Sequence, residues 1–259
     1  MPRNFLQPLL VALASTLALS CNQQPTQPTD AAVQPSGAAV SAQPATSAKS
    51  ASKIPAFDPG DFVRVIDNRY FPLRPGTRFV YQGTEDGEPE RTVTDVTHRQ
   101  KTILGVKVVV VVDRVFLSGA LIEKTLDWYA QDKHGNVWYL GEDSKEYENG
   151  KVVSTAGSWE AGKDGARAGV IMLAHPHVGQ TYQQEFASGV AEDMAEVLGL
   201  HAKVSVPYGS FDHCLKTAET TPLEPGAKEI KLYCRGIGFV KGDDVAGGTA
   251  HAVLTRIIR

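Results

Sequence analysis

Short runs of β-branched and aromatic residues recur from residue 78 to residue 257, and glycine or proline stands between most of them. Such runs are typical of β-strands, and the short spacing of the turn residues predicts an antiparallel sheet. We therefore expect a mainly β fold, with one large curved antiparallel sheet or half-barrel and one or two short helices. The expected strands are residues 78–81, 91–98, 106–112, 121–131, 136–147, 181–186, 202–206, 211–217, 229–235 and 251–257.

Three of these runs have the clearest patterns. Residues 106–112 are valine except for Lys107, which is typical of a strand buried on both faces. Residues 121–131 and 136–147 form the clearest hairpin, because Gly135 in the connection can adopt a positive φ. A short helix is expected to begin at residues 58–61, with Pro59 at the first helical position and Phe62, Val65 and Ile66 on one face. Residues 189–200 fit a helix and a strand equally well.

The first 21 residues are typical of an export signal. Arg3 precedes an apolar run at residues 9–19, which is too short to span a bilayer as a helix and ends in small residues. Ala18-Leu19-Ser20-Cys21 resembles the lipobox of exported bacterial lipoproteins. This resemblance implies that Cys21 is acylated, with palmitate as the expected fatty acid, and becomes the new N-terminus.

The next segment, residues 22–53, consists almost wholly of Gln, Pro, Thr, Ala and Ser. This composition cannot bury a core and predicts a disordered tether whose ends lie about 30 Å apart. We expect residues 54–259 to form a single β-rich globular domain near the membrane. Asn22 follows the cysteine, and the resemblance to enteric lipoproteins, in which Asp at this position retains the protein in the inner membrane, implies an outer-membrane location.

The charge balance restricts the partners of this domain. Residues 54–259 contain 23 basic and 28 acidic side chains, without a lysine-arginine cluster. Phosphate binding needs concentrated positive charge, so we expect no nucleic-acid partner. For the same reason we expect the membrane contact to come from the acyl anchor and not from a polybasic patch.

Two cysteines remain once Cys21 is acylated. Cys214 and Cys234 lie in two expected strands on either side of a turn-rich segment, residues 221–226. Antiparallel neighbours would bring their sulfurs together, and an oxidising compartment would favour a disulfide. The alternative is a pair of buried thiols that do not meet.

The hairpin carries an aromatic candidate for ligand binding. Trp128, Tyr129, Trp138 and Tyr139 come from its two arms, and adjacent residues of a strand point to opposite faces. We expect one Trp–Tyr set to face the interior of the sheet. It could line a site for an apolar or sugar ligand, or only fill a core and fix the register.

Carboxylates and histidines in the middle of the chain are candidate metal ligands. Acidic residues interleaved with glycines suggest irregular loops that could hold Ca²⁺, although the ordered spacing of a calcium-binding loop is absent. His175 and His177 alternate around Pro176 and could share one side of an extended segment for Zn²⁺ or Cu²⁺. Solvated side chains are the alternative. The candidate ligands are His175, His177, Glu142, Asp143 and Asp164, and no resident cofactor is otherwise expected.

Three short sequence segments resemble segments of known domains. They are residues 70–77 (YFPLRPGT), residues 221–226 (TPLEPG) and residues 233–240 (YCRGIGFV). Together they are similar to secreted bacterial domains of the TapB-like group, and the wider pattern resembles the LolA and LolB lipoproteins. The resemblance implies a curved antiparallel half-barrel around an apolar cavity, and it supplies no functional residue. The acidic, glycine-rich insert at 141–170 departs from that pattern.

These features support three functional hypotheses. The leading one is a non-enzymatic, lipid-anchored envelope protein that binds an apolar or amphipathic small molecule, or an envelope partner, through the concave face of its sheet. The first alternative is an envelope hydrolase that uses the carboxylates of residues 142–196, with or without a metal. The second is a structural or adhesive surface lipoprotein. No catalytic motif such as G-x-S-x-G or H-E-x-x-H occurs, so no catalytic residue is assigned.

Overall fold

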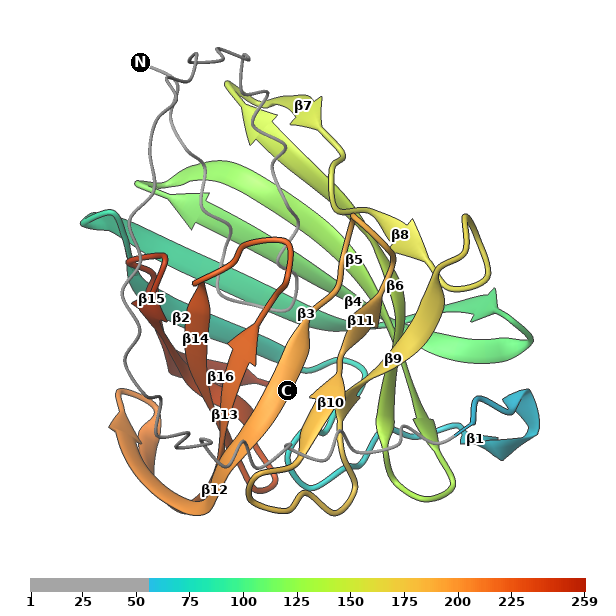
Figure 1. Ribbon diagram of the computed structural model, residues 1–259. Coiled ribbons are helices and arrows are strands. Elements are labelled where there is room, and N and C mark those ends of the chain that lie inside the picture. Colours follow the sequence, from blue (N-terminus) through green and yellow to red (C-terminus); the bar gives the residue numbers. More distant parts are fainter. Residues whose placement is uncertain (1–55) are drawn as a thin grey trace, which may run out of the picture.

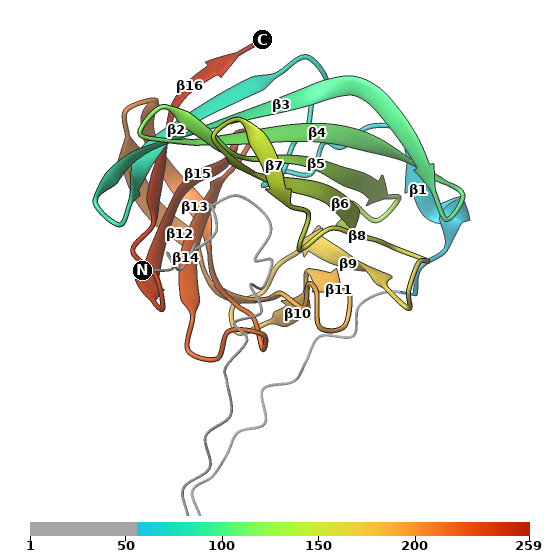
Figure 2. The same ribbon diagram turned by 90° about the horizontal axis from the view of Figure 1, so that it is seen from above.

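The computed structural model describes residues 56–259, and their strands join into one antiparallel sheet that curves into a nearly closed barrel shape (Figures 1 and 2). This confirms the predicted fold class. The strands are β1 (Phe62–Val63), β2 (Arg78–Glu85), β3 (Glu88–Ile103), β4 (Val106–Leu117), β5 (Ala120–Asp132), β6 (Val137–Glu148), β7 (Lys151–Ser154), β8 (Trp159–Glu160), β9 (Arg167–Met172), β10 (Thr181–Gln183), β11 (Glu185–Phe186), β12 (Met194–Val206), β13 (Gly209–Thr220), β14 (Lys228–Cys234), β15 (Gly238–Ala246) and β16 (His251–Ile258).

The two edges of the sheet meet in one short segment. The strand order is β10-β12-β13-β14-β15-β16-β2-β3-β4-β5-β6-β9-β11, so β10 and β11 stand at opposite ends although only Gln184 separates them in the chain. The single strand expected at residues 181–186 is therefore wrong, because its two halves pair with different neighbours. A Cβ at Gly169 of β9 would collide with the backbone of Gln184. Because glycine has no side chain, the two edges of the sheet can approach closely at this position.

Helical structure is limited to one turn within the described residues. The expected continuation through Phe62, Val65 and Ile66 is wrong, because Phe62 and Val63 pair with β5 as strand β1. Pro59–Asp61 form a 3₁₀ helix (η1), and the side chain of Asp58 accepts a hydrogen bond from the backbone N–H of Gly60 at 2.8 Å. The segment that fitted a helix and a strand equally well belongs to β12 from Met194 onward, where it pairs with β13. Pairing with a neighbouring strand decided the outcome, because the apolar residues fitted both periodicities.

The loop between β1 and β2 crosses one end of the sheet and carries the segment at residues 70–77. Asn68 anchors this loop: its Oδ1 accepts hydrogen bonds from the backbone N–H groups of Tyr70 and Phe71. Its Nδ2 donates to the carbonyls of Gly135 and Leu173. All four contacts are buried or partly buried, so the loop is fixed to the hairpin and to the residues after β9.

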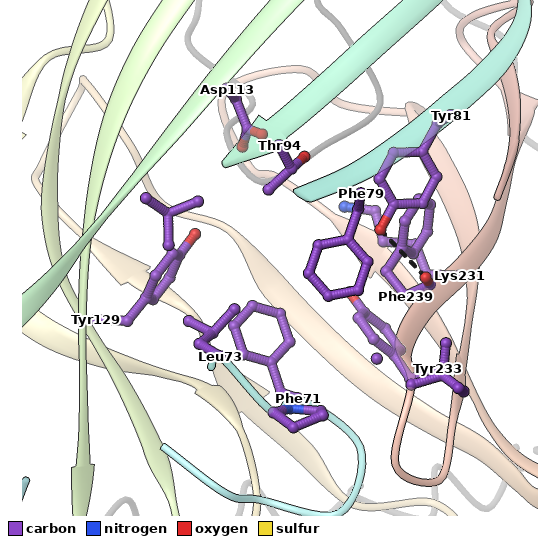
Figure 3. A pocket seen from close by; sticks show the side chains of 14 residues that line it. Phe71, Leu73, Phe79, Tyr81, Thr94, Asp113, Tyr129, Lys231, Tyr233 and Phe239 are labelled. Carbon is purple, nitrogen blue, oxygen red and sulfur yellow. Dashed lines mark hydrogen bonds between the residues drawn. The ribbon is translucent and has the colours of Figure 1, made fainter. Parts of the chain in front are cut away.

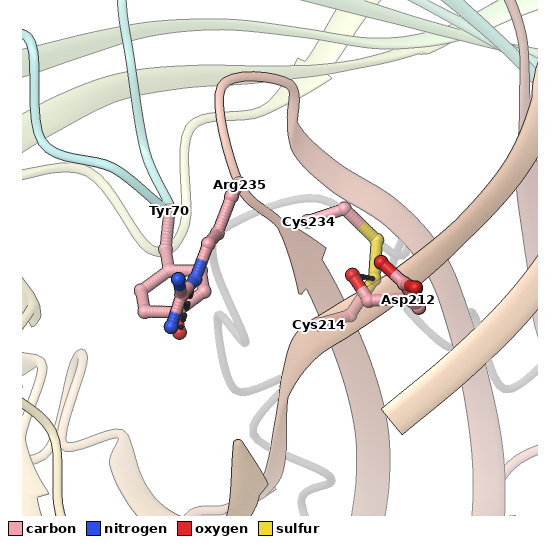
Figure 4. The surroundings of a disulfide bond; sticks show 5 residues. All are labelled: Tyr70, Asp212, Cys214, Cys234 and Arg235. Carbon is pink, nitrogen blue, oxygen red and sulfur yellow. Dashed lines mark hydrogen bonds between the residues drawn. A yellow bond between two sulfur atoms is a disulfide. The ribbon is translucent and has the colours of Figure 1, made fainter. Parts of the chain in front are cut away.

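The predicted disulfide between Cys214 and Cys234 is confirmed (Figure 4). It joins β13 to β14, whose register pairs Leu215 with Tyr233. The next residue, Arg235, donates a hydrogen bond from Nε to the hydroxyl of Tyr70 at 3.2 Å. The disulfide-linked strands are thereby tied to the loop that crosses the end of the sheet.

The valine-rich strand is buried as its sequence predicted, since Val108 to Val112 of β4 are all buried. Phe57 and Phe62 pack with Trp138 of β6 at ring distances of 5.5 and 6.0 Å. Because Trp138 and Tyr139 are adjacent, this N-terminal segment covers the face of the hairpin opposite to Tyr139. The hairpin is therefore buried on both faces.

Within residues 56–259, no helix combines the length and the apolar character that a membrane crossing requires. The expected signal at residues 1–21, the acylation of Cys21 and the tether at 22–53 lie outside the described residues.

Candidate functional site

A small cavity lies inside the sheet next to the loop that crosses its end (Figure 3). Its free volume is about 40 Å³, enough for a few water molecules or the end of a hydrocarbon group. The wall is aromatic on one side and polar on the other. It is formed by Phe71, Pro72, Leu73, Phe79, Tyr81, Thr94, Val111, Asp113, Tyr129, Lys231, Tyr233, Ile237, Gly238 and Phe239.

The hairpin contributes its tyrosines to this interior and directs its tryptophans elsewhere. Tyr129 and Tyr139 are register partners of β5 and β6, and their rings stack at 4.7 Å. Trp128 and Trp138 neighbour them in sequence and do not line the cavity. The expected Trp–Tyr set is therefore a Tyr–Tyr set, because the register pairs the two tyrosines directly.

A β-bulge places Glu142 on the same face as Tyr139. Tyr129 pairs with Tyr139 and Asp127 with Glu142, so β6 contains one more residue than β5 between these pairs. Gly141, at φ 128°, lies in the bulge and has no room for a Cβ beside the backbone of Trp159. The bulge brings the carboxyl of Glu142 to within 3.2 Å of the Tyr139 hydroxyl.

Four carboxyl groups gather around the stacked tyrosines. Burial raises the pKa of Asp113 to about 7. Burial, with the neighbouring Asp113 charge, also raises the pKa of Asp127. The pKa values of Glu142 and Glu185 are raised too, first by burial and then by nearby carboxylates. The group therefore holds protons in a range where exposed carboxyls are ionised.

A second polar group surrounds Lys231 of β14. Its ammonium lies 2.8 Å from Glu219 and 3.1 Å from Glu229, and all three side chains are buried. Burial alone would lower the pKa of Lys231, but the two carboxylates raise it overall. Tyr233, which lines the cavity, donates its hydroxyl hydrogen to Glu219 at 3.1 Å. This ion triad therefore connects the cavity with the polar interior.

The carboxyl lining continues toward the surface. Glu85 and Glu90 of β2 and β3 are buried, and burial, followed by the charge of Glu90, raises the pKa of Glu85 to about 8. Asp244 of β15 is half-buried and adds its charge to the surroundings of both Glu85 and Glu229. Acidic groups thus extend from the closed interior to a partly exposed position.

The five candidate metal ligands do not converge. Glu142 points into the interior, whereas Asp143 forms an ion pair with Lys145 at 2.6 Å. His175 and His177 are exposed, with the first beside Arg69, and Asp164 lies in an exposed turn. Across residues 56–259 no three His, Cys, Asp or Glu side chains are grouped to hold a metal ion.

The sequence did not reveal most of the interior residues. Asp127, Glu142 and Glu185 lie in strands, within ranges that the sequence predicted to be strands, but their convergence in one interior was not predicted. Asp113, Glu219 and Lys231 were not singled out. One sequence signal could have indicated this interior. Thr94, Asp113 and Asp127 are polar residues within largely apolar strands, and the strand register brings them close together. A polar residue in an otherwise buried strand marks such a position.

The comparisons with known proteins give one distant structural likeness. No protein-family model matches the chain, and no curated protein matches its sequence. A crystal structure from Parabacteroides distasonis ATCC 8503, described as a "putative lipoprotein", is similar with a TM-score of 0.42 and 14% sequence identity. The match covers 74% of this chain and 99% of the other. A likeness at this level assigns no function.

Proposed function

We propose that this chain is a lipid-anchored, non-enzymatic protein of the bacterial cell envelope that binds a small amphipathic molecule inside its sheet. The observation that carries the proposal is the interior cavity, with Phe71, Phe79 and Phe239 on one side and Asp113 and Tyr129 on the other. Such a two-sided wall suits a ligand with an apolar end and a polar end.

The cavity size limits the ligand. A free volume of about 40 Å³ is far below the several hundred that an enclosed drug-sized ligand fills. A long acyl chain therefore does not fit as it would in a large apolar half-barrel. The proposed ligand inserts a short hydrocarbon or a ring edge among the aromatic side chains and leaves its polar part among the carboxyl groups.

Native mass spectrometry tests the binding proposal. The full chain, purified from its own envelope, is expected to carry a small molecule that Val111→Phe removes. Val111 lines the cavity and is buried, so a phenyl group there occupies the free volume. Val153→Phe, on the exposed face of β7, is the matched control. If the wild-type chain retains no small molecule and binds no short amphiphile added to it, the proposal is wrong.

The anchor is tested separately. The lipobox sequence that ends in Cys21 supports acylation and attachment to the outer membrane. Cys21→Ser should abolish the acyl mass at the mature N-terminus and release the chain from the membrane fraction. Unchanged fractionation of this variant would contradict the anchor.

A further inference from the structure

The buried interior has a large excess of acidic groups. Among residues 56–259, eleven carboxyl side chains are buried, and Lys231 is the one buried side chain that carries a positive charge. Lys231 is already shared by Glu219 and Glu229. Asp132 is also satisfied, because it accepts hydrogen bonds from the hairpin loop and Trp138. The other buried carboxyls are Glu85, Glu90, Asp113, Glu123, Asp127, Glu142, Glu185 and Asp193.

Several side chains in this region have buried hydrogen-bonding atoms without a partner, and Glu185 and Tyr129 are two of them. Glu185 of β11 is 1% exposed, and neither of its carboxylate oxygens has a hydrogen-bond partner. The hydroxyl of Tyr129, also 1% exposed, has none either. Buried polar atoms are nearly always hydrogen-bonded, so groups of this kind indicate a missing partner. Figure 3 shows the Tyr129 hydroxyl pointing into the cavity, toward the side of Asp113.

The same few residues surround both groups. The hydroxyl of Tyr129 lies in the field of Asp127, Asp113, Glu142 and Glu185. Glu185 in turn interacts electrostatically with Glu142 and Asp127. The unpartnered oxygens therefore belong to one region with several hydrogen-bond acceptors. Lys231, the cation that acts on Glu185, is already shared by Glu219 and Glu229.

We propose that this region binds an organic cation, an ammonium-bearing amphiphile, with Glu185, Glu142 and Asp127 around the ammonium and the apolar part in the aromatic cavity. The proposal rests on the proposed function and specifies its ligand class. An ammonium supplies several N–H donors to acceptors that now lack them. The faces of Tyr129 and Tyr139 add cation–π attraction.

The chemistry of the region favours an organic cation over a metal ion. Ca²⁺ and Zn²⁺ need converging, ionised ligands at short, defined distances. No such group of three exists in the described part of the chain. Burial raises the pKa values of Asp113 and Asp127, which disfavours a fully ionised ligand set. An ammonium bonds to separated oxygens, tolerates a protonated neighbour and keeps a hydrocarbon tail that fits the adjoining wall.

Titration calorimetry of the full chain in detergent tests this with three probes that share one tail: hexylamine, 1-hexanol and hexanoate. We expect hexylamine to bind about tenfold or more tightly than hexanol and hexanoate to bind weakest, because charge complementarity in a buried site dominates the difference. If hexylamine and hexanol bind equally, the cation proposal is wrong and the amphiphile proposal stands. If no probe binds, both are wrong.

Isosteric variants locate the cation. Glu185→Gln and Glu142→Gln should each weaken hexylamine binding about tenfold and leave hexanol binding unchanged. Asp143→Asn is the matched control, because Asp143 pairs with Lys145 away from the interior. Tyr129→Phe should weaken hexylamine binding several-fold without loss of fold, since its hydroxyl has no partner to lose. Displacement of hexylamine by equimolar CaCl₂, or unchanged affinity in both glutamate variants, would overturn the proposal.

Discussion

The hydroxyl of Tyr139 lies 2.7 Å from Oδ1 of Asp127 on the neighbouring strand. A phenol has one hydrogen to donate, and the shorter bond is to Asp127. Glu142 accepts from the same hydroxyl at the longer distance of 3.2 Å, and two ionised carboxylates beside one hydroxyl would repel each other. The raised pKa of Glu142, caused first by burial and then by Asp127, agrees with this arrangement.

Because buried carboxyl groups hold protons in the folded state, the folded protein should lose stability as the pH rises. Burial raises the pKa of Glu123 to about 7 and that of Glu229 to about 8 in the folded state. Between the ordinary carboxyl pKa of about 4.5 and these values, the folded state binds more protons than the unfolded state. The free energy of unfolding therefore falls with rising pH, by roughly 1 kcal/mol per pH unit and proton.

Urea unfolding of the full chain from about pH 5 to about pH 8 measures this slope. Glu123→Gln should reduce it, because the amide does not titrate, whereas Glu88→Gln at an exposed position should not. A wild-type stability that rises over this range would contradict the prediction.

Lys231→Met should destabilise the fold strongly near neutral pH. The change leaves Glu219 and Glu229 buried without their cation, and breaking a buried ion pair in this way costs about 3–5 kcal/mol. The loss should shrink at acidic pH, where Glu229, whose pKa burial raises to about 8, is protonated and needs no counter-ion. Urea midpoints at about pH 5 and pH 8 measure the difference.

The matched control is Lys241→Met. Lys241 pairs with Asp243 at 3.1 Å on a partly exposed part of β15, and exposed pairs contribute about 0–1 kcal/mol. An equal loss at both pH values for Lys231→Met would show that packing of the lysine stem, and not its charge, is what the fold requires.

Asn68→Ala should detach the loop that closes one end of the sheet. The substitution leaves the N–H groups of Tyr70 and Phe71 and the carbonyls of Gly135 and Leu173 without the amide that bonds them. We expect a loss of about 3 kcal/mol in unfolding free energy.

The loss should also be visible locally. Hydrogen exchange of the amides of Tyr70 and Phe71 should accelerate relative to the wild type. Arg64→Ala, at an exposed position nearby, is the control. Unchanged exchange at these two amides would mean that the remaining contacts of the loop, including Arg235 with Tyr70, hold it without Asn68.

The sheet was predictable because its signals are local. Val106 to Val112 could be recognised from composition alone, and Gly135 marked the turn of the hairpin. Strand β15 was missed because Gly242, Asp243 and Asp244 weaken its β pattern, although it pairs on both sides. Its place in the sheet is set by pairing with β14 and β16, and this pairing cannot be predicted from the residues of β15 alone.

The interior was not predictable for a different reason. Tyr139 and Glu142 are three residues apart, so regular alternation places them on opposite faces, and only the bulge at Gly141 unites them. Glutamate is usually exposed to solvent, so the sequence does not predict the burial of Glu185. Its burial depends on the seam between β10 and β11. Neither the bulge nor the seam is evident from the alternation of residues within one strand.

The disulfide should contribute about 3 kcal/mol, since it closes a loop of 20 residues in the unfolded chain. Cys214→Ala combined with Cys234→Ala should lower the urea midpoint accordingly, and reductant should lower the wild-type midpoint to the same value. Both half-cystines are almost completely buried, so the reductant should act only on unfolded chains. Cys21→Ser, which leaves the pair intact, is the control. Equal midpoints for the double variant and this control would show that the link between β13 and β14 constrains a segment that the sheet already holds.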